Sequence, residues 1–298
     1  MKGRSMTSRL EQPYITGHTR LTGLIGGNVR ESFSPEMHTI SFEHSGIDAV
    51  YLSLNVLPEN LEAAVEGARA LGFMGCNVTM PHKTYILPYL DDLSPAAKLM
   101  GAVNTVKFTE DGMAIGYNTD GEGFTRNAVE NGVELKGKTM TIVGAGGAGS
   151  AVLGQCAMDG VATIHVFNIK DEFFDKIATR LDDIAQATGA KIMLHDLADT
   201  EELARCVAES DIFLNATKVG ALGMEDQCVL PEEMLHEGLV VADTVYNPKT
   251  TKLLAMAREH GNKTLSGIGM LLWQGSVAEE IYAGKAMDVE FVENALFS

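Results

Sequence analysis

The sequence predicts a two-domain α/β protein in which mainly parallel sheets are covered by helices. Short apolar runs alternate with segments of helical periodicity from about residue 21 onward. A polar segment near residue 133 interrupts this alternation, which then resumes. A glycine-rich turn at 144–149 directly follows a strand-like run and precedes an apolar helical segment. These three observations favour a first α/β domain joined to a second, doubly wound sheet.

Length and composition are those of an ordinary globular protein. The 298 residues are 45% hydrophobic and 21% charged, enough to bury a substantial core in two domains. The four cysteines lie far apart without metal-ligand spacing, so we expect reduced thiols and a cytoplasmic protein. We find neither a secretory leader pattern nor an apolar stretch of about 18 residues, and expect no membrane insertion. The formal charge of -17 makes nucleic acid a poor partner.

The first half of the chain alternates predicted strands with predicted helices. Ser34 and Pro35 open a helix after the strand-like run LTGLIG. Leu61, Val65 and Ala68 share one face of the next helix, which lies between the strand-like runs AVYLSLNV and FMGCNVT. This order predicts a largely parallel sheet.

A short helix and a hairpin follow in the predicted first domain. Ser94 and Pro95 have the residue types of an N-cap and a first helical position, and Gly101 is suited to end that helix. The segments AVNTVKFT and MAIGYN are then joined by a connection that contains the Asp111-Gly112 pair, which is typical of a tight turn between antiparallel strands.

The second half repeats the alternation after the polar segment VELKGK. Five strand-like runs and their intervening helices predict the second sheet, and two further helices end the chain, the last from about Val289. If these last helices pack back on the first domain, that domain is discontinuous. We therefore expect a substrate-binding domain of residues 21–122 and 268–298, a dinucleotide-binding domain of residues 123–267, and an extension of unknown role at 1–20.

The turn TIVGAGGAGSAV predicts a phosphate-binding loop of the Rossmann type. Gly144, Gly146 and Gly149 have the G-x-G-x-x-G spacing between a strand and a helix. Glycines admit close backbone approach, and free N–H groups at a helix start near Gly147 favour an anion such as pyrophosphate. A merely tight turn is the alternative. The predicted loop contains Gly144, Ala145, Gly146, Gly147, Ala148 and Gly149.

The residues at the end of the following strand do not decide between NAD and NADP. NAD sites usually have an acidic residue there, which accepts hydrogen bonds from the ribose hydroxyls. Here Asn168 avoids repulsion of a 2′-phosphate and Lys170 is able to pair with one, but Asp171 follows and no arginine is present. The sequence therefore predicts NAD or NADP.

Polar residues recur at strand ends and helix starts of the first half. Because ligands of open α/β sheets bind beyond the carboxyl ends of the strands, we expect these side chains to converge. Each has an ordinary alternative: an N-cap for Ser34, solvent for Lys83, and turn chemistry for Asp120. The set comprises Ser32, Ser34, Asn77, Thr79, Lys83, Asn104 and Asp120.

Lys83 and Asp120 have the chemistry that oxidation of an alcohol requires. Negative charge develops on the alcohol oxygen when hydride leaves for a nicotinamide. An ammonium group stabilises that oxygen, and a carboxylate orients the ammonium group. Such a pair titrates as a unit, so the sequence does not say which member carries the proton.

Short motifs along the chain match those of a known enzyme family. They are SFSP, GCNVTMPHK, GAVNT, GYNTDGEGF, GAGGAGSA, NATKVG, YNP and GMLLWQG. With these motifs the chain resembles the shikimate dehydrogenase family, and in particular its quinate/shikimate dehydrogenase branch. The resemblance extends from about Leu21 to the C-terminus, and the segment before Leu21 has no counterpart in it. Ile169 stands where NADP-using members commonly have an arginine, which leaves NAD or NADP as the implied cofactor.

The resemblance implies roles for individual residues. Lys83 and Asp120 would be the catalytic pair at the C3 oxygen of shikimate or quinate. The implied substrate-binding residues are Ser32, Ser34, Asn77, Thr79, Asn104, Tyr246 and Gln274, with Asp120 also near the ring hydroxyls. The implied cofactor-binding residues, besides the loop 144–149, are Asn168, Lys170, Thr217, Gly267 and Met270.

We therefore predict an NAD(P)-dependent oxidoreductase that interconverts shikimate and 3-dehydroshikimate, quinate and 3-dehydroquinate, or both. The alternatives are a metabolite sensor on the same scaffold and a dehydrogenase of a related cyclic acid such as aminoshikimate. A sensor has no need of Lys83 and Asp120. We expect a small-molecule partner, and a homodimer is one option for the assembly. We expect no metal, because the histidines show no ligand spacing.

Overall fold

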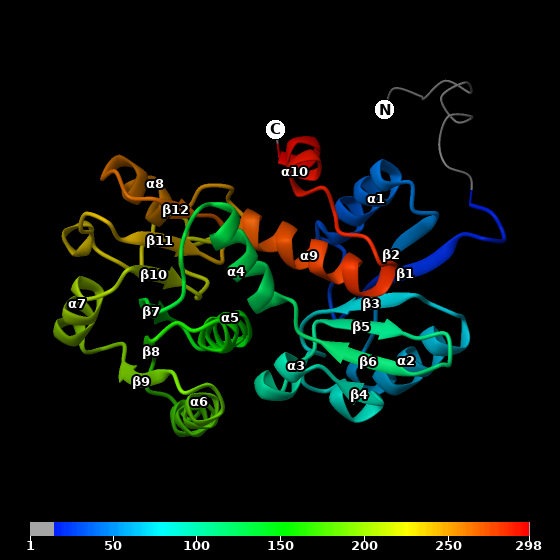
Figure 1. Cartoon of the computed structure of the whole chain (residues 1–298), viewed down its shortest axis with the longest axis horizontal. Helices are drawn as coiled ribbons and strands as arrows, with labels where there is room; N and C mark the ends of the chain where they lie inside the picture. The colour runs from blue at the N-terminus through cyan, green and yellow to red at the C-terminus, as the bar shows by residue number, and fades with distance from the viewer. Residues whose placement is uncertain (1–14, 298) are drawn as a thin grey trace. The chain divides into compact units, whose positions relative to one another are not determined.

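A computed structural model describes residues 15–297, which form two compact units (Figure 1). The first unit comprises the described residues up to Asp92, Val103–Gly116 and the residues from Ala278 onward. The second comprises Leu93–Ala102 and Tyr117–Val277. Most of the 1–20 extension, residues 1–14, lies outside the described residues.

The first sheet has the strand order β2-β1-β3-β5-β6-β4. β1 is parallel to both β2 and β3, whereas β3 is antiparallel to β5. The hairpin predicted around Gly112 is present, and this glycine has a φ of 87°. The strands are β1 (Arg20–Gly26), β2 (Ala49–Asn55), β3 (Gly75–Val78), β4 (Asp92–Leu93), β5 (Thr105–Phe108) and β6 (Ala114–Tyr117).

Helices of the first unit follow the sequence signals closely. α1 (Ser34–Ser45) begins at the Ser-Pro pair, and α2 (Leu61–Ala70) buries the predicted apolar face. α10 (Val289–Phe297) is the predicted last helix. A core of α1, β1, β2 and the C-terminal part of α9 (Gly267–Ala283) contains Leu24, Val29, Phe42, Tyr51, Met74, Ala278 and Tyr282.

The second sheet is parallel throughout, with the order β12-β11-β10-β7-β8-β9. Its sixth strand is only two residues long, too short to carry an alternating pattern, and was not predicted. The strands are β7 (Thr139–Val143), β8 (Thr163–Asn168), β9 (Lys191–Asp196), β10 (Ile212–Asn215), β11 (Val240–Asp243) and β12 (Thr264–Leu265).

Helices cover both faces of the second sheet, as the predicted doubly wound fold requires. Ile164 and Val166 of β8 face the cluster that contains Leu181 and Ile184, whereas Phe167 faces the cluster that contains Leu203. The two faces of one strand are therefore both apolar. The helices are α3 (Pro95–Met100), α4 (Asp120–Glu130), α5 (Gly147–Met158), α6 (Phe174–Thr188), α7 (Thr200–Ala208), α8 (Lys252–Glu259) and α9 (Gly267–Ala283).

The compact units differ from the expected domains at three segments. Residues 93–102, 117–122 and 268–277 belong to the second unit. Close helix packing accounts for the first two: a Cβ at Gly154 of α5 would collide with Met100, and a Cβ at Gly121 of α4 would collide with the carbonyl of Ala151. The polar segment used to place the boundary follows α4 and gives no sign of these contacts.

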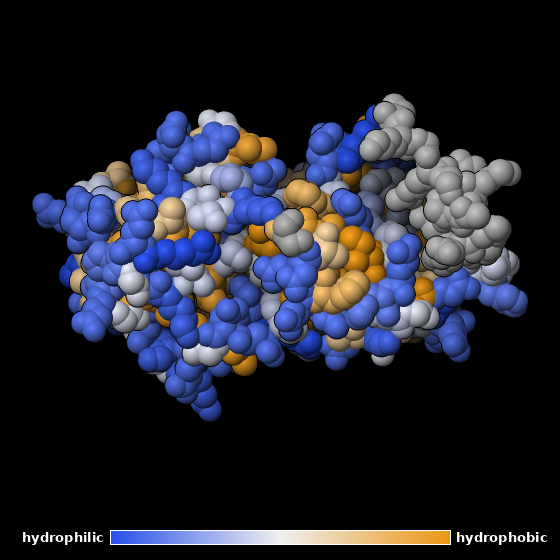
Figure 2. Space-filling view, turned by 90° about the horizontal axis from the view of Figure 1, so that it is seen from above, coloured by the Kyte–Doolittle hydropathy of each residue, from blue (hydrophilic) through white to orange (hydrophobic). Residues whose placement is uncertain are grey.

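Hydrophilic side chains contribute much of the surface, with hydrophobic side chains between them. Figure 2 shows hydrophilic side chains over most of the face that it presents. Within residues 15–297, no helix has both the length and the apolar character that a membrane span requires.

Candidate active site

The carboxyl end of β3 brings two predicted substrate residues together. Asn77 lies opposite Thr105 in the antiparallel pairing of β3 with β5. The amide of Val78 donates to the carbonyl of Asn104 at 2.7 Å, so Asn104 lies at the same edge of the sheet as Asn77. Both asparagine side chains are buried, at 5% and 3% exposure.

Hydrogen bonds join these asparagines to each other through a threonine. The side-chain amide of Asn77 donates to Oγ1 of Thr105 at 3.1 Å, and this hydroxyl donates to Oδ1 of Asn104 at 3.1 Å. Asn77 accepts through Oδ1 from the hydroxyl of Tyr51 at 2.9 Å. The rotamers of both asparagines are therefore fixed by buried partners.

The start of α1 lies beside Tyr51. Oγ of Ser32 donates to Oγ of Ser34 at 3.1 Å. Burial raises the pKa of Tyr51, which keeps its proton available for Asn77, and the nearby hydroxyl of Ser34 acts on this pKa in the opposite direction. The predicted substrate residues thus form two neighbouring hydrogen-bonded groups, Ser32 with Ser34 and Asn77 with Asn104.

Ser34 is not the N-cap that its position suggested. It is the first residue of α1, and Phe33 occupies the cap without a side-chain hydrogen bond. The amide of Ser34 instead donates to Oγ of Ser32 at 3.2 Å. The structure therefore contradicts the alternative in which Ser34 serves only as a cap.

Sequence reasoning missed Tyr51, which lies beside the serines and donates to Asn77. Tyr51 occupies the third position of β2 and is 5% exposed, whereas the next two residues of the strand are exposed. A tyrosine in a half-buried strand is ordinarily a packing residue, and its hydroxyl must find a partner when buried. This need for a hydrogen-bond partner was the signal that the sequence offered for Tyr51. Which residue is the partner depends on the order of the strands in the sheet.

Lys83 lies in a turn that is tied to the neighbouring strands. The amide of Thr79 donates to Ile25 at 2.9 Å, and Nε2 of buried His82 lies 2.8 Å from the carbonyl of Val56. The amide of Val103 donates to the carbonyl of Lys83 at 2.8 Å. The half-buried side chain of Lys83 therefore projects from a fixed backbone of the first unit.

Asp120 is the first residue of α4 in the second unit. Its amide donates to Oδ1 of Asn118 at 3.2 Å, while the side-chain amide of Asn118 donates to the carbonyl of Ala102 at 3.1 Å. A carboxylate at this position is favoured by the positive end of the helix dipole. The site residue is therefore held by local backbone contacts and not by a flexible loop.

The glycine-rich loop has the geometry of a phosphate cradle. Gly144 has a φ of 100°, and α5 begins three residues later, at Gly147. A Cβ at Gly149 would collide with the carbonyl of Gly144, whereas a Cβ at Gly146 or Gly147 would meet nothing within 4 Å. A Cβ at Gly144 would likewise lie 2.9 Å from the carbonyl oxygen of Ala216, so internal packing explains Gly144 and Gly149, whereas open space for a close-lying ligand fits Gly146 and Gly147. The loop fits the pyrophosphate of NAD or NADP.

Residues at the ends of β8 and β10 flank this loop. Oδ1 of Asn168 accepts from the amide of Ala145 at 3.1 Å, which braces the loop. Ile169 is 59% exposed, and the ammonium of Lys170 lies 5.9 Å from the ring centre of Phe174. A cavity of about 630 Å³ adjoins the carboxyl ends of β7 and β10. Its lining includes Val143, Leu197, Thr217 and Val219.

Thr217 is positioned by a buried polar network. Its hydroxyl donates to Oδ1 of Asn215 at 2.7 Å, and the side-chain amide of Asn215 donates to Asp243 at 3.0 Å. Asp243 also accepts from the amide of Val245 and from the hydroxyl of Thr251. Burial nevertheless raises the pKa of Asp243 to about 6.

This raised pKa predicts a pH-dependent stability. The folded protein binds the proton of Asp243 more tightly than the unfolded chain, so the free energy of unfolding should fall as pH rises from about 4 to about 6. The loss is at most about 3 kcal/mol. Asp243→Asn should remove this component when urea unfolding is compared at both pH values, and an unchanged pH dependence would contradict the assignment.

The remaining predicted residues belong to the second unit. Tyr246 follows β11 and is 41% exposed, and Gln274 of α9 donates to the carbonyl of Leu271 at 2.9 Å. A Cβ at Gly267 would collide with the carbonyl of Val245. Met270 is 8% exposed and belongs to the apolar cluster of this unit.

Comparisons with known proteins agree with the sequence resemblance. The family model for the shikimate dehydrogenase substrate binding domain matches residues 24–106. A shikimate dehydrogenase (NADP(+)) of Listeria monocytogenes serotype 4b is 46% identical over 98% of this chain and all of its own length. A quinate/shikimate dehydrogenase of Escherichia coli is 41% identical over 95% of this chain and 98% of its own length.

Solved structures give the same result. Shikimate 5-dehydrogenase from Listeria monocytogenes, in complex with shikimate and NAD, has a TM-score of 0.92 and 47% identity over 96% of this chain and 99% of its own. Quinate dehydrogenase from Corynebacterium glutamicum, in complex with NAD, has a TM-score of 0.84 and 32% identity over 93% of this chain and 99% of its own.

The segment before Leu21 has a counterpart among these relatives. The match to the shikimate dehydrogenase of Listeria monocytogenes serotype 4b covers 98% of this chain and therefore includes part of that segment, so the expectation that it has no counterpart was wrong. The chain belongs to the shikimate dehydrogenase family.

Proposed function

We propose that the protein is an NAD(P)-dependent dehydrogenase that interconverts shikimate or quinate with the corresponding 3-dehydro acid. The observation that carries the proposal is the pair of neighbouring polar groups at the carboxyl edge of the first sheet, Ser32 with Ser34 and the buried network of Asn77 and Asn104. It presents rotatable hydroxyls and fixed amides together, which suits a small molecule with one carboxylate and several hydroxyls. Membership of the family and the glycine cradle of the second unit support the same activity.

Ser32 and Ser34 are suited to the substrate carboxylate. A carboxylate only accepts hydrogen bonds, and both serine hydroxyls can turn their protons toward it. The fixed amides of Asn77 and Asn104 are suited to the ring hydroxyls, which both donate and accept. We assign Thr79, Tyr246 and Gln274 to the same substrate on the resemblance.

Lys83 and Asp120 are assigned to the reacting oxygen. NAD(P) supplies the hydride acceptor for the alcohol and the hydride donor for the ketone. The ammonium of Lys83 donates a hydrogen bond to the C3 oxygen as negative charge develops there. We assign Asp120 to the same reaction, in which the pair together takes up the hydroxyl proton.

The activity is tested by the absorbance of reduced nicotinamide with shikimate and with quinate, each against NAD and NADP. We expect turnover of at least one acid, and NAD use because exposed Ile169 offers no charge to a 2′-phosphate. A strong preference for NADP would show that Lys170 determines the cofactor. Absence of turnover in all four combinations would contradict the proposed function.

Tyr51→Phe tests the substrate network without touching the catalytic pair. Removal of the hydroxyl takes a donor from Asn77. We expect KM for the acid to rise about 3- to 10-fold with kcat nearly unchanged, since a neutral hydrogen bond contributes about 1 kcal/mol. Tyr85→Phe, at an exposed tyrosine, is the control. An unchanged KM for Tyr51→Phe would remove the network from substrate binding.

We further propose a cytoplasmic homodimer. The four cysteines are free, as in proteins of reducing compartments. β2 is an edge strand of the first sheet and exposes Leu52, which is 43% exposed, so its unpaired backbone is available to a second copy. Sedimentation equilibrium should give twice the chain mass of 32.0 kDa.

A further inference from the structure

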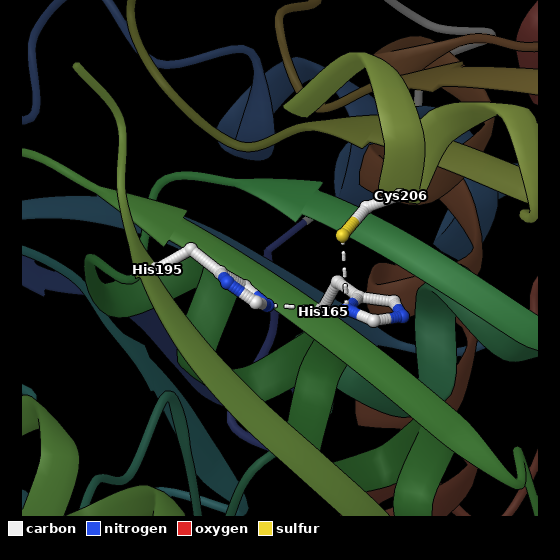
Figure 3. A group of neighbouring side chains, drawn as sticks. All are labelled: His165, His195 and Cys206. Carbon is white, nitrogen blue, oxygen red and sulfur yellow. Dashed lines mark hydrogen bonds between the residues drawn. The ribbon is translucent and has the colours of Figure 1, made fainter. Parts of the chain in front are cut away.

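Three side chains that are distant in the sequence converge in the second unit, apart from the residues assigned above. Nδ1 of His165 lies 3.1 Å from Nε2 of His195 and 3.2 Å from Sγ of Cys206 (Figure 3). One potential ligand atom of each residue lies within 4.8 Å of the others. His165 and Cys206 are buried, and His195 is half-buried.

The fold holds these residues on rigid elements. His165 lies in β8 and His195 in the neighbouring strand β9. In the register, Phe167 lies opposite His195, and alternation places His165 on the same face as Phe167. Helix α7 covers this face and supplies Cys206. The convergence therefore results from strand register and helix packing.

The separations approach those of a tetrahedral metal site. With Zn–N distances of about 2.1 Å and a Zn–S distance of about 2.3 Å, tetrahedral angles require about 3.4 Å between nitrogens and about 3.6 Å between nitrogen and sulfur. The two observed separations are a few tenths of an ångström shorter. Small rotations of the side chains would open the required space.

Nδ1 of His165 faces two neighbours of the cluster at once. This atom of a neutral imidazole carries either one hydrogen or one lone pair, so it makes one good hydrogen bond, but it lies close to both His195 and Cys206. Sγ of Cys206 also lies 3.6 Å from Oε1 of Glu202 and 3.6 Å from Nη2 of Arg205. A cation that accepts lone pairs from both nitrogens and the sulfur would replace the contacts among the three side chains.

The surrounding charges are compatible with a cation. Burial lowers the pKa of His165 and of His195, which keeps both imidazoles in the neutral form that ligates metals. Glu202 and Glu209 pair with the guanidinium of Arg205 and offset its charge. Burial raises the pKa of the Cys206 thiol to about 11, so a bound ion would displace one proton from it to solvent.

We propose that His165, His195 and Cys206 form a binding site for a borderline-soft divalent cation of the zinc type. Imidazole and thiolate together select zinc or its analogues over magnesium or calcium. Oε1 of Glu202 pairs with Arg205 at 2.6 Å and lies 3.6 Å from Nδ1 of His195, so water would complete the tetrahedron at the fourth position. The linear spacing of the histidines and cysteines predicted no metal, so the assignment depends on the fold.

Cobalt(II) titration of the chelator-treated full chain tests this site. We expect one equivalent to bind, with the visible bands of tetrahedral cobalt and a near-ultraviolet thiolate charge-transfer band. Zinc should displace the cobalt and raise Tm by roughly 5 °C at a free concentration about 100-fold above its Kd. Absence of the thiolate band in the wild-type chain would overturn the proposal.

Two pairs of variants locate the ligands. Cys206→Ser should abolish the charge-transfer band, whereas Cys228→Ser, at a half-buried free cysteine, should retain it. His195→Gln should weaken cobalt binding at least about 100-fold, whereas His236→Gln should not. Circular dichroism verifies that each variant is folded. If Cys206→Ser does not fold, the comparison of His195→Gln with His236→Gln decides the result. A band that persists in Cys206→Ser would overturn the assignment.

Discussion

Replacement of Lys83 by alanine is expected to lower kcat by about 10²- to 10⁴-fold while KM for the acid changes by less than about tenfold. The ammonium group contributes mainly when charge develops on the substrate oxygen, so its loss affects the transition state more than the bound substrate. The backbone of Lys83 is fixed through Val103, and truncation of the side chain leaves that contact in place. Steady-state kinetics with saturating cofactor measures both parameters.

Lys107→Ala is the matched control, because Lys107 is a half-buried lysine of the same unit. It should retain nearly normal kcat. Asp120→Asn should also lower kcat, and the double variant should be little worse than the more damaged single variant, because the two groups act as a pair. Near-normal kcat in Lys83→Ala, or strictly multiplicative losses in the double variant, would contradict the shared mechanism.

Features that depend on neighbouring residues in the chain could be predicted from the sequence. Ser94 caps α3 by accepting from the amide of Ala97, and Gly101 ends that helix with a φ of 56°. α5 begins at Gly147, as the glycine spacing indicated. These signals come from residues within one or two turns of each other, where backbone geometry limits the choices.

Features that depend on tertiary packing were not predictable in the same way. Tyr51 of β2 and Asn77 of β3 meet because both strands pair with β1, one on each side. The apolar pattern of a strand does not specify this order of strands in the sheet. His165 and Cys206 are 41 positions apart and meet through the packing of α7. The strand alternation and family motifs identified the candidate substrate residues, but not the tyrosine that donates to one of them.

Glu279 is a second residue whose importance only the structure reveals. It lies in the mainly apolar helix α9, and its side chain is fully buried. Oε1 lies 2.6 Å from Nδ1 of His38, and Oε2 accepts from the hydroxyl of Ser41 at 2.6 Å. Nε2 of His38 has no partner among the described residues, so Glu279 is the main polar partner of this ring. The ring of His38 also stacks on Tyr51 of the substrate network, with 4.3 Å between the ring centres.

Glu279→Ala is therefore expected to lower the free energy of unfolding by about 3–5 kcal/mol, because it leaves two buried donors without acceptors and opens a cavity. Glu279→Gln is the matched control: its carbonyl can accept from His38 while its amide donates to Ser41, and the expected loss is only about 1 kcal/mol. Urea unfolding followed by circular dichroism at neutral pH measures both variants. A loss below about 1 kcal/mol for Glu279→Ala, or equal losses for the two variants, would show that these hydrogen bonds do not stabilise the first unit.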